Sequence, residues 1–221
     1  SIDWFVSDKP RIVIREVTSK GVIQAAILNS NMVFSNSVDG MRVRSNFENH
    51  THLFLAIINS KLISFYHQNS SPNSFKDSFP KVLIKDLKQI PISDIDFNSN
   101  VVRRISELAE TTIQNTNSLY EVANKLTRQV KRKFSLELLS NKLQNWYELS
   151  FTEFTKELKK KKIKLSLLQE EEWEEYFEGQ KKKIVELQFN LKQSENKIDQ
   201  LVYELYELTD DEVNLMKEAN A

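Results

Sequence analysis

The apolar positions in the last third of the chain repeat with the period of a helix. They alternate in steps of three and four, with one break at Ser194, at Ile184, Leu187, Leu191, Ile198, Leu201, Leu205 and Leu208. This stripe predicts one long amphipathic helix over Trp173–Leu208. At about 1.5 Å per residue, such a helix is about 54 Å long, so a second long element is needed to cover its apolar seam.

A second stripe supplies that element. Apolar residues between Val101 and Phe134 fall on one helical face through roughly ten turns, and we expect this helix to lie antiparallel to the first. Between the two, Leu136–Leu158 is predicted to be helical, and the run Lys159–Lys162 is expected in a solvated turn. Thr209 followed by Glu212 is a capping box, which predicts a short closing helix over Asp210–Ala219.

The front of the chain alternates apolar and polar residues in short runs between turn residues. Strands are predicted over Arg11–Val17 and Val22–Leu28, a short apolar run follows at Met32–Phe34, and Asp39-Gly40 is a hairpin signal. Further along, His52–Tyr66 predicts one buried helix. A short strand and a proline-stopped segment, over Lys81–Ile92, are expected to close this part.

These patterns predict an α+β protein with two domains. A small mixed or antiparallel sheet domain is expected over residues 1–98, and a long antiparallel, coiled-coil-like helical arm ending in a helical hairpin over residues 99–221. All four prolines and two of the three glycines precede residue 92, which agrees with strands and turns in front and helices behind.

The amino-acid composition excludes several classes of protein. The 221 residues include no cysteine, which excludes disulfides and thiol chemistry. No apolar run approaches about 18 residues and no signal peptide opens the chain, so a soluble, cytoplasmic protein without membrane insertion is expected. The first residues lack an initiating Met and enter a strand-like pattern at once, as in a piece of a longer polypeptide.

The net charge of zero hides an uneven distribution. Residues 1–147 contain 19 Lys and Arg against 13 Asp and Glu, whereas residues 148–221 contain 12 against 18. The front is therefore basic and the back acidic.

The end of the long helix carries a recognisable motif, Ile198-Asp199-Gln200-Leu201-Val202-Tyr203-Glu204-Leu205-Tyr206-Glu207-Leu208-Thr209. It resembles the closing motif of type IIG and related restriction-modification proteins, single chains that couple an adenine methyltransferase to a DNA specificity domain. The front resembles TaqI-like C-terminal specificity domains, through Lys9–Arg15, Ile57–Tyr66 and Ile84–Ile92.

The resemblance implies a target recognition domain that reads a sequence in duplex DNA. It also implies a parent chain whose other domains methylate adenine N6 with S-adenosylmethionine and cleave DNA with Mg²⁺. The partners implied are therefore double-stranded DNA and the methyltransferase and nuclease domains of the same parent chain.

These residues themselves offer no catalytic, cofactor-binding or metal-binding group. No Gly-x-Gly occurs and no two prolines are adjacent, so the methyl-donor loop and the Asn/Asp-Pro-Pro-aromatic motif are both missing. Glu170–Glu175 spread around a helix axis and do not converge on a metal. His50-x-His52 lacks a third ligand. This stretch is not expected to be catalytic by itself.

DNA binding is better supported, because Arg and Lys recognise guanine, and Asn and Gln recognise adenine, when loops present them to the major groove. The candidates in the front are Arg15, Lys20, Arg42, Arg44, Asn46, Asn49, His50, His67, Asn69, Asn73 and Lys76. In the segment that contains Arg42 to His50, the side chains of Met41, Val43 and Phe47 are expected to point inward and anchor it. For each candidate, the alternative is a solvated polar loop residue.

A basic segment ends the first long helix and includes Arg128, Lys131 and Arg132. These residues are candidates for phosphate contacts, which hold DNA without reading its sequence. The alternative is pairing with acidic residues on the facing helix.

Two other classes of function stay open. The chain is consistent with half of a type I specificity subunit, although only one recognition domain is visible. It is also consistent with a protein-interaction module that forms a homodimer through the seam between Ile184 and Leu208.

Overall fold

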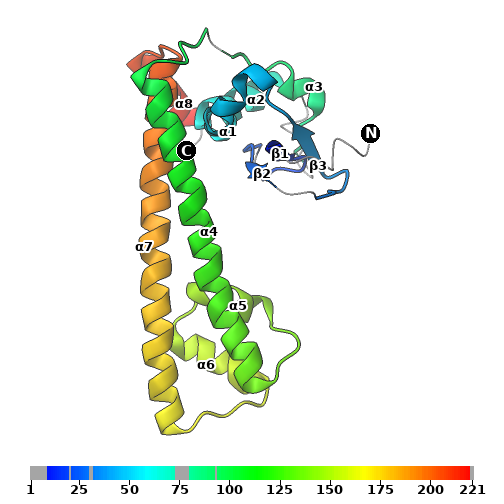
Figure 1. The fold of residues 1–221 in the computed structure, drawn as a ribbon. Coiled ribbons are helices and arrows are strands. Elements are labelled where there is room, and N and C mark those ends of the chain that lie inside the picture. Colours follow the sequence, from blue (N-terminus) through cyan, green and yellow to red (C-terminus); the bar gives the residue numbers. More distant parts are fainter. Residues whose placement is uncertain (1–8, 20, 30–31, 73–79, 93, 220–221) are drawn as a thin grey trace. The chain divides into compact units, whose positions relative to one another are not determined.

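The computed structural model describes residues 9–219, apart from positions 20, 30–31, 73–79 and 93. Its fold is α+β, as predicted (Figure 1). In chain order the elements are β1 (Arg11–Arg15), β2 (Ala25–Leu28), β3 (Val38–Met41), η2 (Ser45–His50), α1 (Thr51–Asn59), α2 (Lys61–Ser70), α3 (Ile84–Leu87), α4 (Asn100–Phe134), α5 (Asn141–Gln144), η3 (Trp146–Glu148), α6 (Phe151–Lys160), α7 (Leu167–Leu205) and α8 (Asp210–Ala219).

The chain divides into two compact units. The first unit contains Ser1–Thr111 and Ser194–Ala221, and the second contains Thr112–Gln193. The predicted boundary at residue 98 falls between α3 and α4, whereas the compact units divide the two long helices α4 and α7 between them.

The sheet of the first unit has the order β2-β1-β3, and β1 is antiparallel to both neighbours. Alternate residues of a strand point to the same face, and on one face of β1 both Ile12 and Ile14 are fully buried. A hairpin turn at Asp39-Gly40 was the wrong prediction, because both residues lie inside β3 and Gly40 pairs with Val13.

The turn before β3 lies earlier in the chain than the Asp-Gly pair. The Val38 amide donates to the Ser35 carbonyl at 3.2 Å, and the Ser35 and Ser37 hydroxyls lie 2.6 Å apart. The preceding apolar run Met32–Phe34 forms no strand, and Val33 is 71% exposed.

The single helix predicted over His52–Tyr66 is two helices, α1 and α2. Ser60 between them has an extended backbone, with φ −67° and ψ 155°. Its hydroxyl accepts from the Ile63 amide at 3.3 Å and donates to the Ile57 carbonyl at 2.7 Å, so one side chain ends α1 and begins α2. Hydrophobic periodicity does not register this break, because apolar residues continue on both sides.

The long helices follow their predicted ranges closely. α4 begins one residue before the predicted Val101 and ends at Phe134, while α7 begins earlier than Trp173 and ends before Leu208. The Thr209–Glu212 capping box is present, and α8 has its predicted bounds. Within the described part of the chain, no helix combines the length and apolar character needed to cross a membrane.

The segment predicted to be helical over Leu136–Leu158 is broken into α5, η3 and part of α6. Ser140 caps α5 by accepting from the Leu143 amide, and Ser150 forms a capping box with Glu153 at the start of α6. Of the run Lys159–Lys162, expected in a turn, the first two residues belong to α6, which ends at Lys160, and Lys162 adopts a positive φ of 62° in the turn that follows.

Aromatic residues form the core of the second unit. Trp146, Phe154 and Phe177 are fully buried, with the Phe177 ring 5.3 Å from Trp146 and 5.1 Å from Phe154. The Trp146 indole donates to the Ala123 carbonyl of α4 at 3.1 Å. This core therefore includes η3 and α6 as well as α4 and α7. A coiled-coil arm and a homodimer through it stay predictions.

Candidate nucleic-acid interface

Two loops meet at the end of the sheet where β1 ends, at Arg15. One follows β1 and the other leads into α3. The Thr18 amide donates to the Pro80 carbonyl and the Val82 amide to the Glu16 carbonyl, both at 2.9 Å. Lys81 forms an ion pair with Glu16 at 2.8 Å. The loop after β1 is therefore fixed to the segment that leads from the α2–α3 loop into α3.

The same loop packs on the end of α2 through Gly21. Gly21 has φ +74°, and a Cβ on it would lie 2.9 Å from the Gln68 Cγ, so a side chain here would be strained and crowded. Neighbouring Asn69 is exposed and donates to the Phe65 carbonyl at 2.8 Å.

His67 belongs to the interior of this region. Its ring is 2% exposed, so it is not on the surface where a base edge could meet it. Burial lowers the pKa of His67, against the opposing effects of the Asp86 carboxylate and a hydrogen bond to the Lys81 backbone. The neutral ring supports the junction of α2 with the loops, a role that its position in a polar sequence segment does not reveal.

Arg15, like Asn69, is a described candidate that is exposed at this end. Its side chain is exposed and makes no ion pair with any described residue. Nearby, burial and the Glu16 carboxylate raise the pKa of Asp39. The candidates Lys20, Asn73 and Lys76, predicted for the same loops, lie outside the described residues.

The opposite end of the sheet carries a second group of candidates. Ile12 pairs with Met41, so the chain beyond β3 emerges beside the start of β1, about 13 Å from Arg15 at 3.3 Å per residue. Here Arg44 begins η2, and Arg44, Asn46 and Asn49 are all exposed. Arg42, just after β3, is half-buried. The structure therefore separates candidates that the sequence places in one set.

Aromatic contacts hold this second group in place. The Phe97 ring lies 5.0 Å from Phe47 and 4.6 Å from the candidate His50. Ahead of β1, Lys9 forms a 2.6 Å ion pair with Glu48 of η2. We call Arg44–His50 the η2 segment: its inward ring is packed, and its outward residues are one Arg and two Asn.

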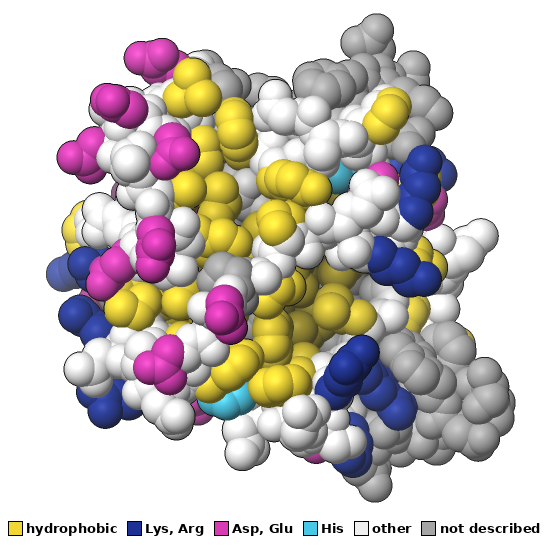
Figure 2. Space-filling model, turned by 90° about the horizontal axis from the view of Figure 1, so that it is seen from above, with side chains coloured by type: hydrophobic (Ala, Val, Ile, Leu, Met, Phe, Trp, Pro, Cys, Tyr) yellow, Lys and Arg dark blue, Asp and Glu magenta, His cyan; other side chains and the backbone are white. Residues whose placement is uncertain are grey.

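An apolar hollow of about 470 Å³ adjoins the η2 segment. It is lined by Met41, Val43, Arg44, Phe47, Phe54, Ile58, Leu87, Ile90 and Ile92. Met41, Val43 and Phe47 face it as their alternation with polar residues predicts. Figure 2 shows a hollow with apolar walls on one face of the structure, with Lys and Arg side chains along one side of it.

The third group of candidates lies in the second unit. Arg128, Lys131 and Arg132 are exposed on the last two turns of α4. Arg132 donates to the Gln129 side chain at 3.0 Å, and none of the three forms an ion pair with a described residue. The alternative pairing with acidic residues of α7 is therefore absent from the described contacts of these three side chains.

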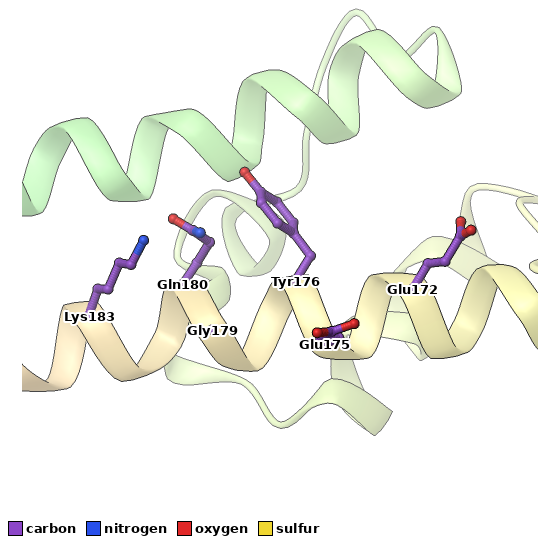
Figure 3. A pocket seen from close by; sticks show the side chains of 6 residues that line it. All are labelled: Glu172, Glu175, Tyr176, Gly179, Gln180 and Lys183. Atoms are coloured by element: carbon purple, nitrogen blue, oxygen red, sulfur yellow. The ribbon is translucent and has the colours of Figure 1, made fainter.

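A second hollow, of about 350 Å³, lies along α7 in the second unit. Its lining is polar and comes from one helix, Glu172, Glu175, Tyr176, Gly179, Gln180 and Lys183 (Figure 3). Tyr176 points toward α4, its buried hydroxyl has no partner among the described residues, and burial raises its pKa. Across the described residues, no group of three or more His, Cys, Asp or Glu is arranged to hold a metal ion.

The closing motif has a structural role that the sequence did not reveal. The Asp199 carboxylate accepts from the Lys61 amide at 2.9 Å and from its ammonium at 3.0 Å. Tyr206 donates to the Pro91 carbonyl at 2.9 Å. Burial, followed by the nearby Asp199 charge, raises the pKa of Tyr203 to about 12. These contacts join the end of α7 to the sheet domain. The available signal in the sequence was the presence of two polar residues, Asp199 and Tyr206, along an apolar helix seam.

Two family models match the chain. Residues 98–202 match a domain of unknown function, DUF8810, and residues 1–92 match the TaqI-like C-terminal specificity domain. No curated protein and no solved structure is significantly similar to the chain. The match over the front supports DNA sequence recognition in restriction-modification systems. Residues 1–92 of this chain are a TaqI-like C-terminal specificity domain.

Proposed function

We propose that the specificity domain reads a short base sequence in duplex DNA and directs adenine-N6 methylation by a methyltransferase domain of the same parent chain. That domain would use S-adenosylmethionine, and a Mg²⁺-dependent nuclease domain would cleave at a distance set by the helical part of this chain. The residues described above supply recognition and spacing, not the methyl transfer or the cleavage.

The η2 segment is the observation that carries the proposal for base reading. Arg44, the residue before η2, and Asn46 and Asn49 of η2 are exposed, and Phe47 of the same helix packs against Phe97. Arg pairs with guanine through two hydrogen bonds and Asn with adenine, provided that a rigid scaffold delivers them to the groove. Phe47 and the Lys9–Glu48 ion pair provide that support.

Arg15 and the joined loops at the other end of the sheet form a second contact region in this proposal. The loops are fixed by backbone hydrogen bonds at Thr18 and Val82, so polar side chains on them have a defined direction. The two regions lie at opposite ends of β1, a strand about 13 Å long at 3.3 Å per residue, which suits successive positions along one groove, since B-DNA rises 3.4 Å per base pair.

Substitution of Arg44 tests the base-reading role. Each bidentate contact contributes about 1 to 3 kcal/mol of discrimination, so Arg44→Ala should relax specificity at one base pair by roughly 5-fold to 150-fold. Lys85→Ala is the matched control, because Lys85 is an exposed cation of α3 in the same unit without an ion pair to a described residue. Equal loss of affinity on selected and random duplexes for Arg44→Ala would refute its role in base reading.

A further inference from the structure

Positive charge concentrates in one stretch of the second unit, within the region that matches a domain of unknown function. Residues 125–164 contain twelve Lys and Arg but four acidic residues, all of them Glu. All twelve basic side chains are exposed. We call them the basic tip: Lys125, Arg128, Lys131, Arg132, Lys133, Lys142, Lys156, Lys159, Lys160, Lys161, Lys162 and Lys164.

Few members of the basic tip form ion pairs with described residues. Ion pairs with described residues involve two of its members, Lys160 with Glu157 at 2.6 Å and Lys159 with Glu170 at 4.0 Å. Glu153 accepts hydrogen bonds from Ser150 in the α6 capping box instead. The other ten cations of the tip therefore face solvent without an ion pair to the described part of the chain.

The two helices that carry most of these cations end at the same place. The Phe134 ring, at the end of α4, lies 5.5 Å from Trp173, and the Phe154 ring of α6 lies 6.1 Å from the same indole. The Lys159–Glu170 ion pair also ties the last turn of α6 to the first turn of α7. The end of α4, through Phe134, and the last turn of α6, through Lys159, therefore both lie against the first two turns of α7 (Figure 1).

Helix dipoles account for part of the tip. Cations in the last turn of a helix are favoured by the partial negative charge of its free carbonyl groups, which explains Lys131 and Lys159. This effect falls off within one turn. It does not explain Arg128 and Lys125, which lie further back along α4, or Lys164, which follows the end of α6. Like charges spaced by three or four residues on a helix also repel each other.

The start of α7 has the opposite charge. Six Glu residues lie between Glu170 and Glu178, and two of them line the hollow on α7 (Figure 3). An anionic polymer is therefore repelled by the start of α7 and attracted by the cations of α4 and α6. A surface with one sign of charge on two converging elements fits an extended chain of negative charges.

We propose that the basic tip binds the phosphate backbone of duplex DNA without reading bases. The inference rests on the proposed function in one respect, because DNA is the polyanion that the specificity domain of the same chain would hold. The proposal assigns a binding surface to the region over residues 98–202. This surface belongs to the second unit and consists of residues other than those proposed to read bases. Each phosphate that the tip neutralises releases counterions, so this binding is steeply salt-dependent.

The test uses the full chain, a random-sequence duplex and dissociation constants measured against salt. Arg128→Gln/Lys131→Gln/Arg132→Gln should lower the slope of log K against log salt by about 2.7, at about 0.9 for each phosphate that the variant no longer neutralises. The control Lys182→Gln/Lys183→Gln/Lys192→Gln removes the same charge from exposed positions of α7 in the same unit. The control should keep the slope of the unmodified chain.

A second variant guards against effects on folding. Lys161→Gln/Lys162→Gln/Lys164→Gln changes exposed residues beyond α6 that do not belong to the aromatic core, and it should lower the slope as well. Unchanged slopes in both tip variants, or equal reductions in the α7 control, would overturn the proposal. Tip-dependent binding to phosphatidylserine vesicles with no change on duplex DNA would overturn it too.

The same titrations keep the two proposals separate. On a duplex selected for tight binding, the tip variants should lose affinity by the same factor as on random duplex, so the ratio between the two stays constant. If Arg44→Ala keeps the salt slope but reduces the ratio of affinities for selected and random duplex, the result tests the proposed function alone. If the tip variants reduce the salt slope but keep this ratio, the result tests the basic tip alone.

Discussion

Replacement of Asp199 tests how the closing motif holds the sheet domain. Its carboxylate accepts from the amide of Lys61, the first residue of α2, at 2.9 Å, and the side chain of Asp199 is 9% exposed. The first amides of a helix have no partner within the helix. Asp199 thus satisfies, from a distant part of the chain, a donor that Ser60 leaves free, since the Ser60 hydroxyl accepts from Ile63.

The expected decrease in stability follows from the two interactions. A hydrogen bond to a charged acceptor contributes about 1.5 to 3 kcal/mol to stability. The Lys61 ammonium is 59% exposed, so its ion pair with Asp199 is screened and contributes about 0.2 to 1 kcal/mol. Asp199→Ala should therefore lower the free energy of unfolding of the first unit by about 2 to 3 kcal/mol. Asp199→Asn, which keeps an acceptor for the amide, should cost about 1 kcal/mol.

Urea unfolding of the full chain measures these changes, and hydrogen exchange at the Lys61 amide reports the local hydrogen bond. The matched variant is Lys61→Met, which removes the ammonium and keeps the backbone amide. It should cost less than Asp199→Ala, and its amide should stay protected. If Lys61→Met costs as much as Asp199→Ala, the ion pair dominates and the capping argument is refuted.

Two glycines and one histidine give further predictions. Gly21→Ala should lower the free energy of unfolding by about 1 to 2 kcal/mol, because an L-residue is strained at φ +74°. Gly179→Ala, in an open helical position, should raise the free energy of unfolding by about 0.5 to 1 kcal/mol. Urea unfolding measures both changes, and two changes of the same sign would contradict the geometry. Burial lowers the pKa of His67 below 6.5, so the unfolded chain binds more protons just below that pH, and stability should fall as the pH drops through this range. His67→Gln should flatten that fall between about pH 7 and about pH 5; an unchanged slope would show that the ring does not titrate in this way.

Periodicity and capping predicted the two long helices and the closing helix of this chain because both are local. The stripes of α4 and α7, and the capping box at Thr209, depend on residues within a few turns of each other. The break at Ser60 was missed because one hydroxyl decides it against a continuous apolar run. The Asp39-Gly40 turn was wrong because β3 pairs with β1, a partner far away in sequence.

The candidate site was predictable as a set of residue types but not as an arrangement. Arg15 and Arg44 are alike in sequence terms, yet the antiparallel register places them at opposite ends of the sheet. His67 stands among polar residues but is buried, with the Asp86 carboxylate and the Lys81 backbone beside it, and neither is near it in sequence. Asp199 and Lys61 are 138 positions apart, and folding alone brings them together.

Selection from a randomised duplex pool, using the full chain, tests the central claim most directly. A domain that reads bases should enrich one short motif, and the enriched duplex should bind with a steep salt slope. The same selection with Arg44→Ala should return that motif with one position relaxed. Recovery of a random pool by the unmodified chain, at a salt concentration where it still binds duplex, would contradict sequence reading by this domain.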